Sequence, residues 1–140
     1  AHMMVQGHKM NLIYYDVYPN ADLENDIARY NEFLAAQGQA PVSCKRAATV
    51  EELLQEADCV SIHTVLDEST HHMINAKRLA LMKPNAVIVN TSRGPVVDEA
   101  ALVDCQAVQM GSMLSILGPL GEWGSVSLFT GREEDLRTLT

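Results

Sequence analysis

The most informative run of the sequence is Ala86-Val-Ile-Val-Asn-Thr-Ser-Arg-Gly-Pro-Val-Val-Asp-Glu-Ala-Ala-Leu102. Its apolar beginning has the composition of a buried strand, and a Gly-Pro turn and a helix start follow. Such a strand presents Thr91, Ser92 and Arg93 at its carboxyl end. In open parallel sheets, ligands bind at that edge. The run therefore predicts a ligand site built around these three residues.

Arg93 is the charged member of this group. Its guanidinium is a rigid fork of donors that matches the two oxygens of a carboxylate, so we interpret Arg93 as a group that clamps an acidic ligand. The alternative is an arginine that pairs with a surface carboxylate, a frequent and weakly stabilising arrangement.

Strand-like and helix-like segments alternate on both sides of this run. Leu23, Ile27, Tyr30 and Leu34 recur at helical spacing, and Thr49-Val-Glu-Glu52 has the pattern of a capping box. Predicted strands cover 11–16, 42–46, 59–63 and 86–91, and predicted helices cover 20–37 (capped by Asn20 and stopped by Gly38), 49–57, 75–82 (capped by Asn75 and ended by Pro84) and 98–105. This alternation predicts an α/β fold with βαβ units and a doubly wound parallel sheet.

The pattern stops after Gln106. Five of the chain's eight glycines lie in 107–140, where strands and helices no longer alternate. We therefore expect one domain over 1–106 and a divergent tail over 107–140, in which the acidic run 133–135 is a solvated face.

Composition narrows the function classes. The 140 residues suit a single domain with a core, and the net charge of −8 argues against nucleic-acid binding. Three cysteines without C-x-x-C spacing favour a reducing compartment, and the sequence shows no signal peptide or peroxisomal address, so we expect a cytoplasmic protein. The glycine-rich stretch 107–129 is a poor membrane span.

Two segments resemble the D-isomer-specific 2-hydroxyacid dehydrogenases, and among them the plant and algal type of hydroxypyruvate and glyoxylate reductase. They are Lys9-Met-Asn-Leu-Ile-Tyr-Tyr-Asp16 and Asn90-Thr-Ser-Arg-Gly-Pro-Val-Val-Asp-Glu-Ala-Ala-Leu102, within a resemblance over about 3–105. It implies a partial Rossmann-like NAD-binding domain that lacks its first strand and its glycine-rich loop. It also implies a small 2-oxo or 2-hydroxy acid as substrate, and family members dimerise. A missing central strand predicts a marginally stable or aggregation-prone chain.

Asp16 ends the strand predicted over 11–16. At the tip of a second Rossmann strand, an acidic side chain accepts hydrogen bonds from ribose hydroxyls and repels a 2′-phosphate, which favours NADH over NADPH. The alternative is a turn aspartate before Pro19. No G-x-G-x-x-G occurs in the sequence, and the spacing of Gly118, Gly121 and Gly124 does not match it.

The resemblance assigns further residues to the site. It gives Arg93 the substrate carboxylate, and it places near the cofactor the strand-end residues His63, Thr64, Val65, Leu66, Thr70, Thr91 and Ser92. Val65 stands where the family commonly has proline. His63 has the alternative role of a hydrogen-bonded structural histidine. His71-His72 lacks a neighbouring carboxylate or cysteine to complete a ligand set, so no metal is predicted.

The family's catalytic histidine and its partner glutamate belong to sequence beyond the matched part. No histidine follows His72, and we transfer the glutamate role to none of Glu122, Glu133 and Glu134. The chain resembles one truncated at both ends, by an altered reading frame, an alternative exon or a mispredicted gene end. Three hypotheses follow: an oxidoreductase domain; an inactive module that binds NAD, as the family's corepressors do, or pairs with other subunits; and an unrelated doubly wound domain such as a methyltransferase or receiver.

Overall fold

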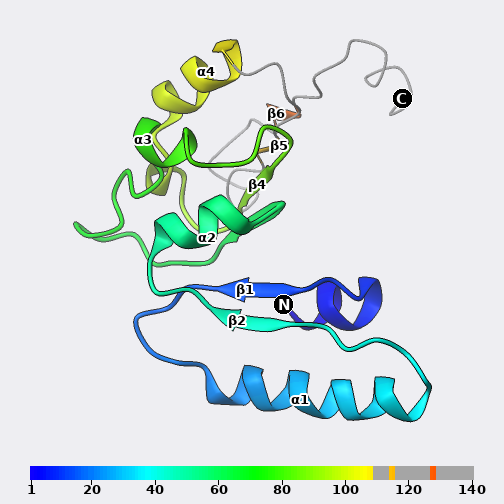
Figure 1. Cartoon of the computed structure of the whole chain (residues 1–140). Coiled ribbons are helices and arrows are strands. Elements are labelled where there is room, and N and C mark those ends of the chain that lie inside the picture. Colours follow the sequence, from blue (N-terminus) through cyan, green and yellow to red (C-terminus); the bar gives the residue numbers. More distant parts are fainter. Residues whose placement is uncertain (109–113, 116–126, 129–140) are drawn as a thin grey trace. The chain divides into compact units, whose positions relative to one another are not determined.

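The computed structural model describes residues 1–108, 114–115 and 127–128 (Figure 1). The chain divides into two compact units, Ala1–Leu53 and Leu54–Thr140. Predictions made for the tail, including the acidic run 133–135 and the glycines at 118, 121 and 124, lie outside the described residues. The division between 106 and 107 stays a prediction.

The first unit is built on a pair of parallel strands. A short π-helix, η1 (Met3–Gly7), precedes β1 (Leu12–Tyr14), and α1 (Ala21–Ala36) connects β1 to β2 (Cys44–Arg46). The two strands pair in parallel, with Leu12 opposite Cys44 and Tyr14 opposite Arg46. This is one βαβ unit, as the alternating pattern predicted.

The long helix of this unit follows its sequence signals. Asn20 caps α1 because its Oδ1 accepts a hydrogen bond of 3.0 Å from the Leu23 backbone N–H. Gly38 follows the helix with φ of +67°, a conformation that glycine adopts at little cost. Ile27 and Leu34 are buried, and Leu23 and Tyr30 pack against them. The helical spacing of these four residues is therefore confirmed as the face of α1 that forms the core.

The remaining elements are α2 (Val50–Glu56), β3 (Cys59–Ile62), α3 (Ala76–Leu79), β4 (Val87–Asn90), the 3₁₀ helix η2 (Gly94–Val96), α4 (Glu99–Val108), β5 (Leu114–Ser115) and β6 (Ser127–Leu128). The alternation of helices and strands continues from α2 to α4, and two short antiparallel strands, β5 and β6, follow. The Thr49 hydroxyl oxygen caps α2 by accepting a hydrogen bond of 3.1 Å from the Glu52 N–H. Asp98 caps α4 in the same way, through a bond of 3.1 Å from the Ala101 N–H.

The parallel strands β3 and β4 determine where the residues of the predicted ligand site lie. Cys59 pairs with Val87 and Ile62 with Asn90, so both strands end at the same edge of their sheet. Along β3 burial alternates, with Val60 and Ile62 buried and Cys59 and Ser61 exposed. The chain therefore leaves both strands side by side, and the two loops that follow meet at one edge.

One predicted helix is shorter than expected. We predicted a helix over 75–82, whereas α3 ends at Leu79. Beyond it, the N–H groups of Leu81 and Met82 donate to the carbonyls of Arg78 and Leu79, three residues back, as in tight turns. The predicted α/β class with parallel strands is confirmed, although β1–β2 and β3–β4 form separate two-stranded sheets.

Candidate functional site

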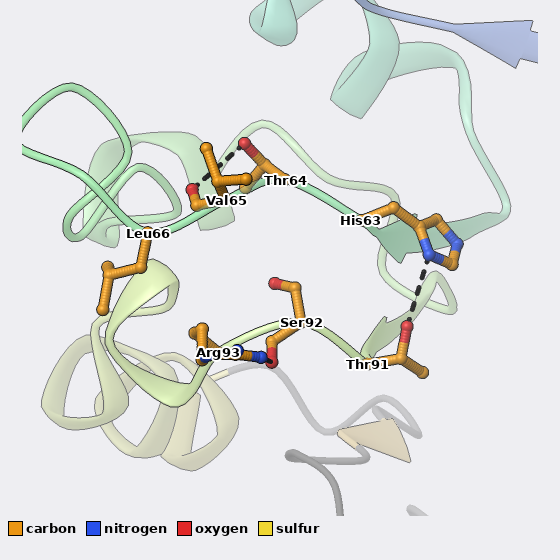
Figure 2. Close-up of a pocket in the computed structure, with 7 residues that line it drawn as sticks. All are labelled: His63, Thr64, Val65, Leu66, Thr91, Ser92 and Arg93. Atoms are coloured by element: carbon orange, nitrogen blue, oxygen red, sulfur yellow. Dashed lines mark hydrogen bonds between the residues drawn. The ribbon is translucent and has the colours of Figure 1, made fainter.

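A pocket of about 570 Å³ lies at the carboxyl ends of β3 and β4. Figure 2 shows the loop after β3 on one side of it and the loop after β4 on the other. Its lining residues are His63, Thr64, Val65, Leu66, Thr91, Ser92 and Arg93. All seven were predicted as site residues from the sequence, so the structure brings these predictions together in one place.

Two other predicted residues do not line the pocket. Thr70 lies behind the first loop and contacts it, and Asp16 belongs to the first unit. The roles assigned to all nine residues stay predictions.

His63 links the two loops. Its Nε2 lies 2.8 Å from the Ser61 hydroxyl oxygen, and its Nδ1 lies 3.4 Å from the hydroxyl oxygen of Thr91. In Figure 2 the ring points toward Thr91, at the strand end of the pocket. Both ring nitrogens therefore have partners in the protein, as expected of a structural histidine.

Asp67 organises the loop that carries Val65. Its Oδ1 accepts hydrogen bonds of 2.6 Å from the Ser69 hydroxyl, 2.8 Å from the Ser69 N–H and 3.1 Å from the Thr70 N–H. These donors favour the charged carboxylate and hold the pKa of Asp67 below its usual value, the Ser69 hydroxyl having the largest effect. Because the Thr70 hydroxyl also donates to the Val65 carbonyl, this loop is closed by its own side chains.

The segments after the two loops are bonded to each other. The His72 N–H donates to the Pro95 carbonyl at 2.8 Å, and the Ile74 N–H donates to the Val96 carbonyl at 3.1 Å. The Asp98 N–H then donates to the Ile74 carbonyl at 2.9 Å. These backbone hydrogen bonds hold the segment that follows the first loop against the segment that follows the second.

Apolar and cationic groups both reach solvent at the pocket. Val65 and Leu66 are exposed by 72% and 41%. The Arg93 guanidinium is also exposed and donates from Nη1 to the Ser92 carbonyl at 2.9 Å. Arginine has further N–H donors, so the fork retains capacity for an anionic ligand. The pocket can therefore accept a ligand with an apolar ring and an acidic group.

Sequence reasoning missed Asn90 as a site residue. Asn90 ends β4 and is 1% exposed. Among the described residues it is the one polar residue that is buried. Its amide bonds to Ser92 and Arg93. The sequence feature that could have indicated this role is an asparagine at the point where an apolar strand ends and a polar loop begins.

Asp16 lies just after β1 in the first unit. Its Oδ1 accepts a hydrogen bond of 3.2 Å from the Tyr18 N–H. Arg46 donates from Nη2 to the carbonyls of Asp16 and Val17, at 2.9 and 3.0 Å. Sequence reasoning also missed Arg46, which holds this turn from the neighbouring strand β2.

Two kinds of feature are absent from the residues that the structure describes. No group of three or more His, Cys, Asp and Glu side chains could hold a metal ion there. No described helix is long and apolar enough to cross a membrane.

The sequence matches the family profile "D-isomer specific 2-hydroxyacid dehydrogenase, NAD binding domain" over residues 1–113. It is 56% identical over 104 residues to a peroxisomal glycerate dehydrogenase of Arabidopsis thaliana, and 54% identical over 104 residues to a glycerate dehydrogenase of Cucumis sativus. Each match covers 74% of this chain and 27% of the relative. The chain thus spans about a quarter of the length of these relatives.

Solved structures show the same fold. D-mandelate dehydrogenase of Rhodotorula graminis superposes with a TM-score of 0.65 and 32% identity, over 89% of this chain and 32% of that one. D-lactate dehydrogenase of Aquifex aeolicus, complexed with NAD and lactic acid, superposes with a TM-score of 0.65 and 28% sequence identity. This match covers 84% of this chain and 31% of that one. The chain belongs to the D-isomer-specific 2-hydroxyacid dehydrogenase family and carries part of its NAD-binding domain.

Proposed function

We propose that this chain is the nucleotide-binding part of an NADH-dependent oxidoreductase that acts on the CH–OH group of small D-2-hydroxy acids. Hydroxypyruvate and glyoxylate are the proposed 2-oxo substrates. The observation that carries the proposal is one pocket, at the carboxyl ends of two parallel strands, that combines Arg93 with hydroxyl and apolar side chains. The names of the plant relatives support the substrate class.

The residues at the pocket suit a dinucleotide. Thr64, Thr91 and Ser92 supply hydroxyl groups that both donate and accept hydrogen bonds, as ribose and amide groups require. The exposed Val65 and Leu66 offer apolar surface to a flat ring. When bound, NAD accepts or donates the hydride.

Asp16 supports the choice of NADH over NADPH. It is exposed at the end of β1, and only its Oδ1 has a hydrogen-bond partner among the described residues, the Tyr18 N–H. The second carboxylate oxygen, Oδ2, is therefore available to a ribose hydroxyl, whereas a 2′-phosphate meets a negative charge.

Arg93 is the proposed anchor for the substrate. Its guanidinium, at one end of the pocket, binds the carboxylate of the 2-oxo acid through a pair of N–H donors. That contact fixes the neighbouring C2 carbonyl and, through the positive charge, favours the negative charge that develops on its oxygen during reduction.

A binding role without turnover is the second candidate. Both ring nitrogens of His63, the histidine that lines the pocket, are engaged by Ser61 and Thr91. A histidine held in this way is poorly placed to transfer a proton to a substrate. This favours a module that binds NAD or pairs with other subunits, including a second copy, since dimerisation is common in the family.

Two measurements on the full chain separate these candidates. NADH binding is followed by quenching of protein or cofactor fluorescence, and turnover by loss of NADH absorbance with glyoxylate or hydroxypyruvate. Binding with turnover supports the oxidoreductase, and binding without turnover supports the module. Failure to bind NADH contradicts the oxidoreductase and the NAD-binding module, and leaves only the module that pairs with other subunits.

We also propose a cytoplasmic location for the chain. Cys44, Cys59 and Cys105 are free thiols, which suits a reducing compartment. Cell fractionation with an antibody to the chain tests this, and recovery in the peroxisomal fraction contradicts it.

A further inference from the structure

Asn90 occupies a position where a polar side chain is costly. It is the last residue of β4, a strand in which half-buried and buried residues alternate. Ile88 and Asn90 are the two buried residues, and each is 1% exposed. In register with it on β3 is the buried Ile62. An amide buried between apolar groups destabilises the fold unless its donors and acceptor are bonded. The fold therefore tolerates Asn90 at this position only if its amide forms hydrogen bonds.

All the hydrogen bonds shown for this amide go to the turn that carries Arg93. The Oδ1 of Asn90 accepts from the N–H and the hydroxyl of Ser92, both at 3.0 Å. Its Nδ2 donates to the Arg93 carbonyl at 2.8 Å. The Arg93 carbonyl also accepts a hydrogen bond of 3.2 Å from the N–H of Val96, the last residue of η2. One buried side chain thus fixes the backbone on both sides of the Arg93 Cα.

We propose that Asn90 is a positioning residue for the carboxylate-binding turn, which it holds in place before the ligand arrives. This inference rests on the proposed role of Arg93. The turn needs an acceptor for Ser92 and a donor for Arg93 on the same short side chain, and asparagine supplies both. Aspartate has no donor for the Arg93 carbonyl, and alanine has neither group. A turn ordered in advance loses less conformational entropy when it binds an anion.

The chain offers a matched control in Asn31. Its Nδ2 donates to the Val42 carbonyl at 2.9 Å, and its Oδ1 accepts from the Val42 N–H at 2.9 Å. Asn31 is part-buried and belongs to the first unit. Asn31→Asp and Asn90→Asp therefore make the same chemical change, an amide donor replaced by a carboxylate oxygen, and only the second does so at the pocket.

The experiment titrates the full chain with glyoxylate in the presence of saturating NADH and compares the wild type with both variants. We expect Asn90→Asp to weaken glyoxylate binding about tenfold or more, because it removes one hydrogen bond and repels the Arg93 carbonyl. NADH binding should change less, and Asn31→Asp should bind glyoxylate like the wild type. Because Asn90→Asp buries a charge and can unfold the chain, the neutral Asn90→Ala variant is measured in parallel.

Amide hydrogen exchange gives a readout that does not depend on the ligand. The Ser92 N–H should exchange slowly in the wild type and faster in Asn90→Ala, while the N–H groups of β4 stay protected. If the folded Asn90 variants bind glyoxylate as tightly as the wild type, the inference is wrong and the proposed function stands. If the wild type binds NADH but no glyoxylate, the proposed role of Arg93 is wrong, and the inference falls with it.

Discussion

The hydroxyl group of Thr70 donates a hydrogen bond of 2.7 Å to the carbonyl oxygen of Val65. Val65 lines the pocket and Thr70 does not. This bond therefore connects the loop after β3 to the turn that begins at Asp67. The Thr70 hydroxyl oxygen also accepts a bond of 2.8 Å from the Asp67 N–H. The Thr70 side chain thereby bonds to the main chain of both Val65 and Asp67.

Replacing Thr70 should loosen this loop. Thr70→Val keeps the shape of the side chain and removes the hydroxyl, so we expect about 1 kcal/mol less stability and several-fold weaker NADH binding. Thr70→Ser keeps the hydroxyl and should restore both. Thermal unfolding and fluorescence titration measure these two quantities. Equal NADH affinity in the valine and serine variants would show that the bond has no part in the site.

Arg93 should determine affinity for the acid and not for the cofactor. Arg93→Gln removes the charge and the paired donors, and we expect about 10- to 100-fold weaker glyoxylate binding with little change for NADH. Arg29→Gln is the control, because the side chain of Arg29 is 79% exposed and faces Asp26 at 3.7 Å in the first unit. Isothermal titration with each ligand distinguishes the two effects. Unchanged glyoxylate affinity in Arg93→Gln would leave Arg93 as a surface residue.

The elements themselves were largely predictable from the sequence. Asn20 and Asn75, which were predicted as caps, cap their helices in the structure, and both act within three residues of their own position, so the signal is local. The strands were predicted because buried parallel strands are short apolar runs. The pocket followed from the same reasoning, since residues that end two parallel strands meet at one edge.

The residues that hold the site in place were not predictable in the same way. Arg46 bonds to the Asp16 carbonyl across 30 positions of sequence, and only the pairing of β1 with β2 brings them together. Asn90 has local partners, but its bonds depend on a turn geometry that the residue types do not specify. The predicted end of α3, at 82, was wrong because Ala80 and Met82 are compatible with a helix as well as with a turn. Tertiary structure decides between the two, and helix propensity does not show it.

Acid should open the Asp67 turn. The hydrogen bonds from Ser69 and Thr70 lower the pKa of Asp67 from its ordinary value of 3.8. A carboxyl group whose pKa is lowered by folding stabilises the fold at every pH above the unfolded value, and this contribution is lost as the pH falls through the folded value. We therefore expect the Ser69 and Thr70 N–H resonances to stay unchanged as the pH falls to about 3.8, and to shift at lower pH. An NMR titration measures this.

Asp67→Asn is the matched variant for that titration. It keeps an oxygen acceptor for the same donors but does not ionise, so its Ser69 N–H resonance should show no transition between neutral and acidic pH. A transition of the same size in both proteins would assign the change to another group.

The buried face of α1 should carry the stability of the first unit. Leu34 is 1% exposed within the core cluster, and Leu34→Ala should cost about 2–5 kcal/mol through lost burial and a cavity. Phe33, next to it on the helix, is 59% exposed and stacks loosely on Tyr30 at 6.3 Å between ring centroids. Phe33→Ala should therefore cost less than Leu34→Ala. Urea unfolding of both variants tests this order, and a reversed order would contradict the assigned face.

Asp16 should set the preference between the two nicotinamide dinucleotides. Asp16→Ala removes the carboxylate that we propose accepts hydrogen bonds from the ribose and repels the 2′-phosphate, so NADH should bind about tenfold more weakly and NADPH more tightly. The backbone of the turn should stay in place, because Arg46 bonds to main-chain carbonyls of Asp16 and Val17 that the substitution does not alter. Asp22→Ala removes another exposed carboxylate, in the first turn of α1, and controls for net charge. Fluorescence titrations with both dinucleotides give the ratio of affinities. A ratio that moves equally in the two variants would indicate a general charge effect, and a shift confined to Asp16→Ala would place the ribose at the end of β1.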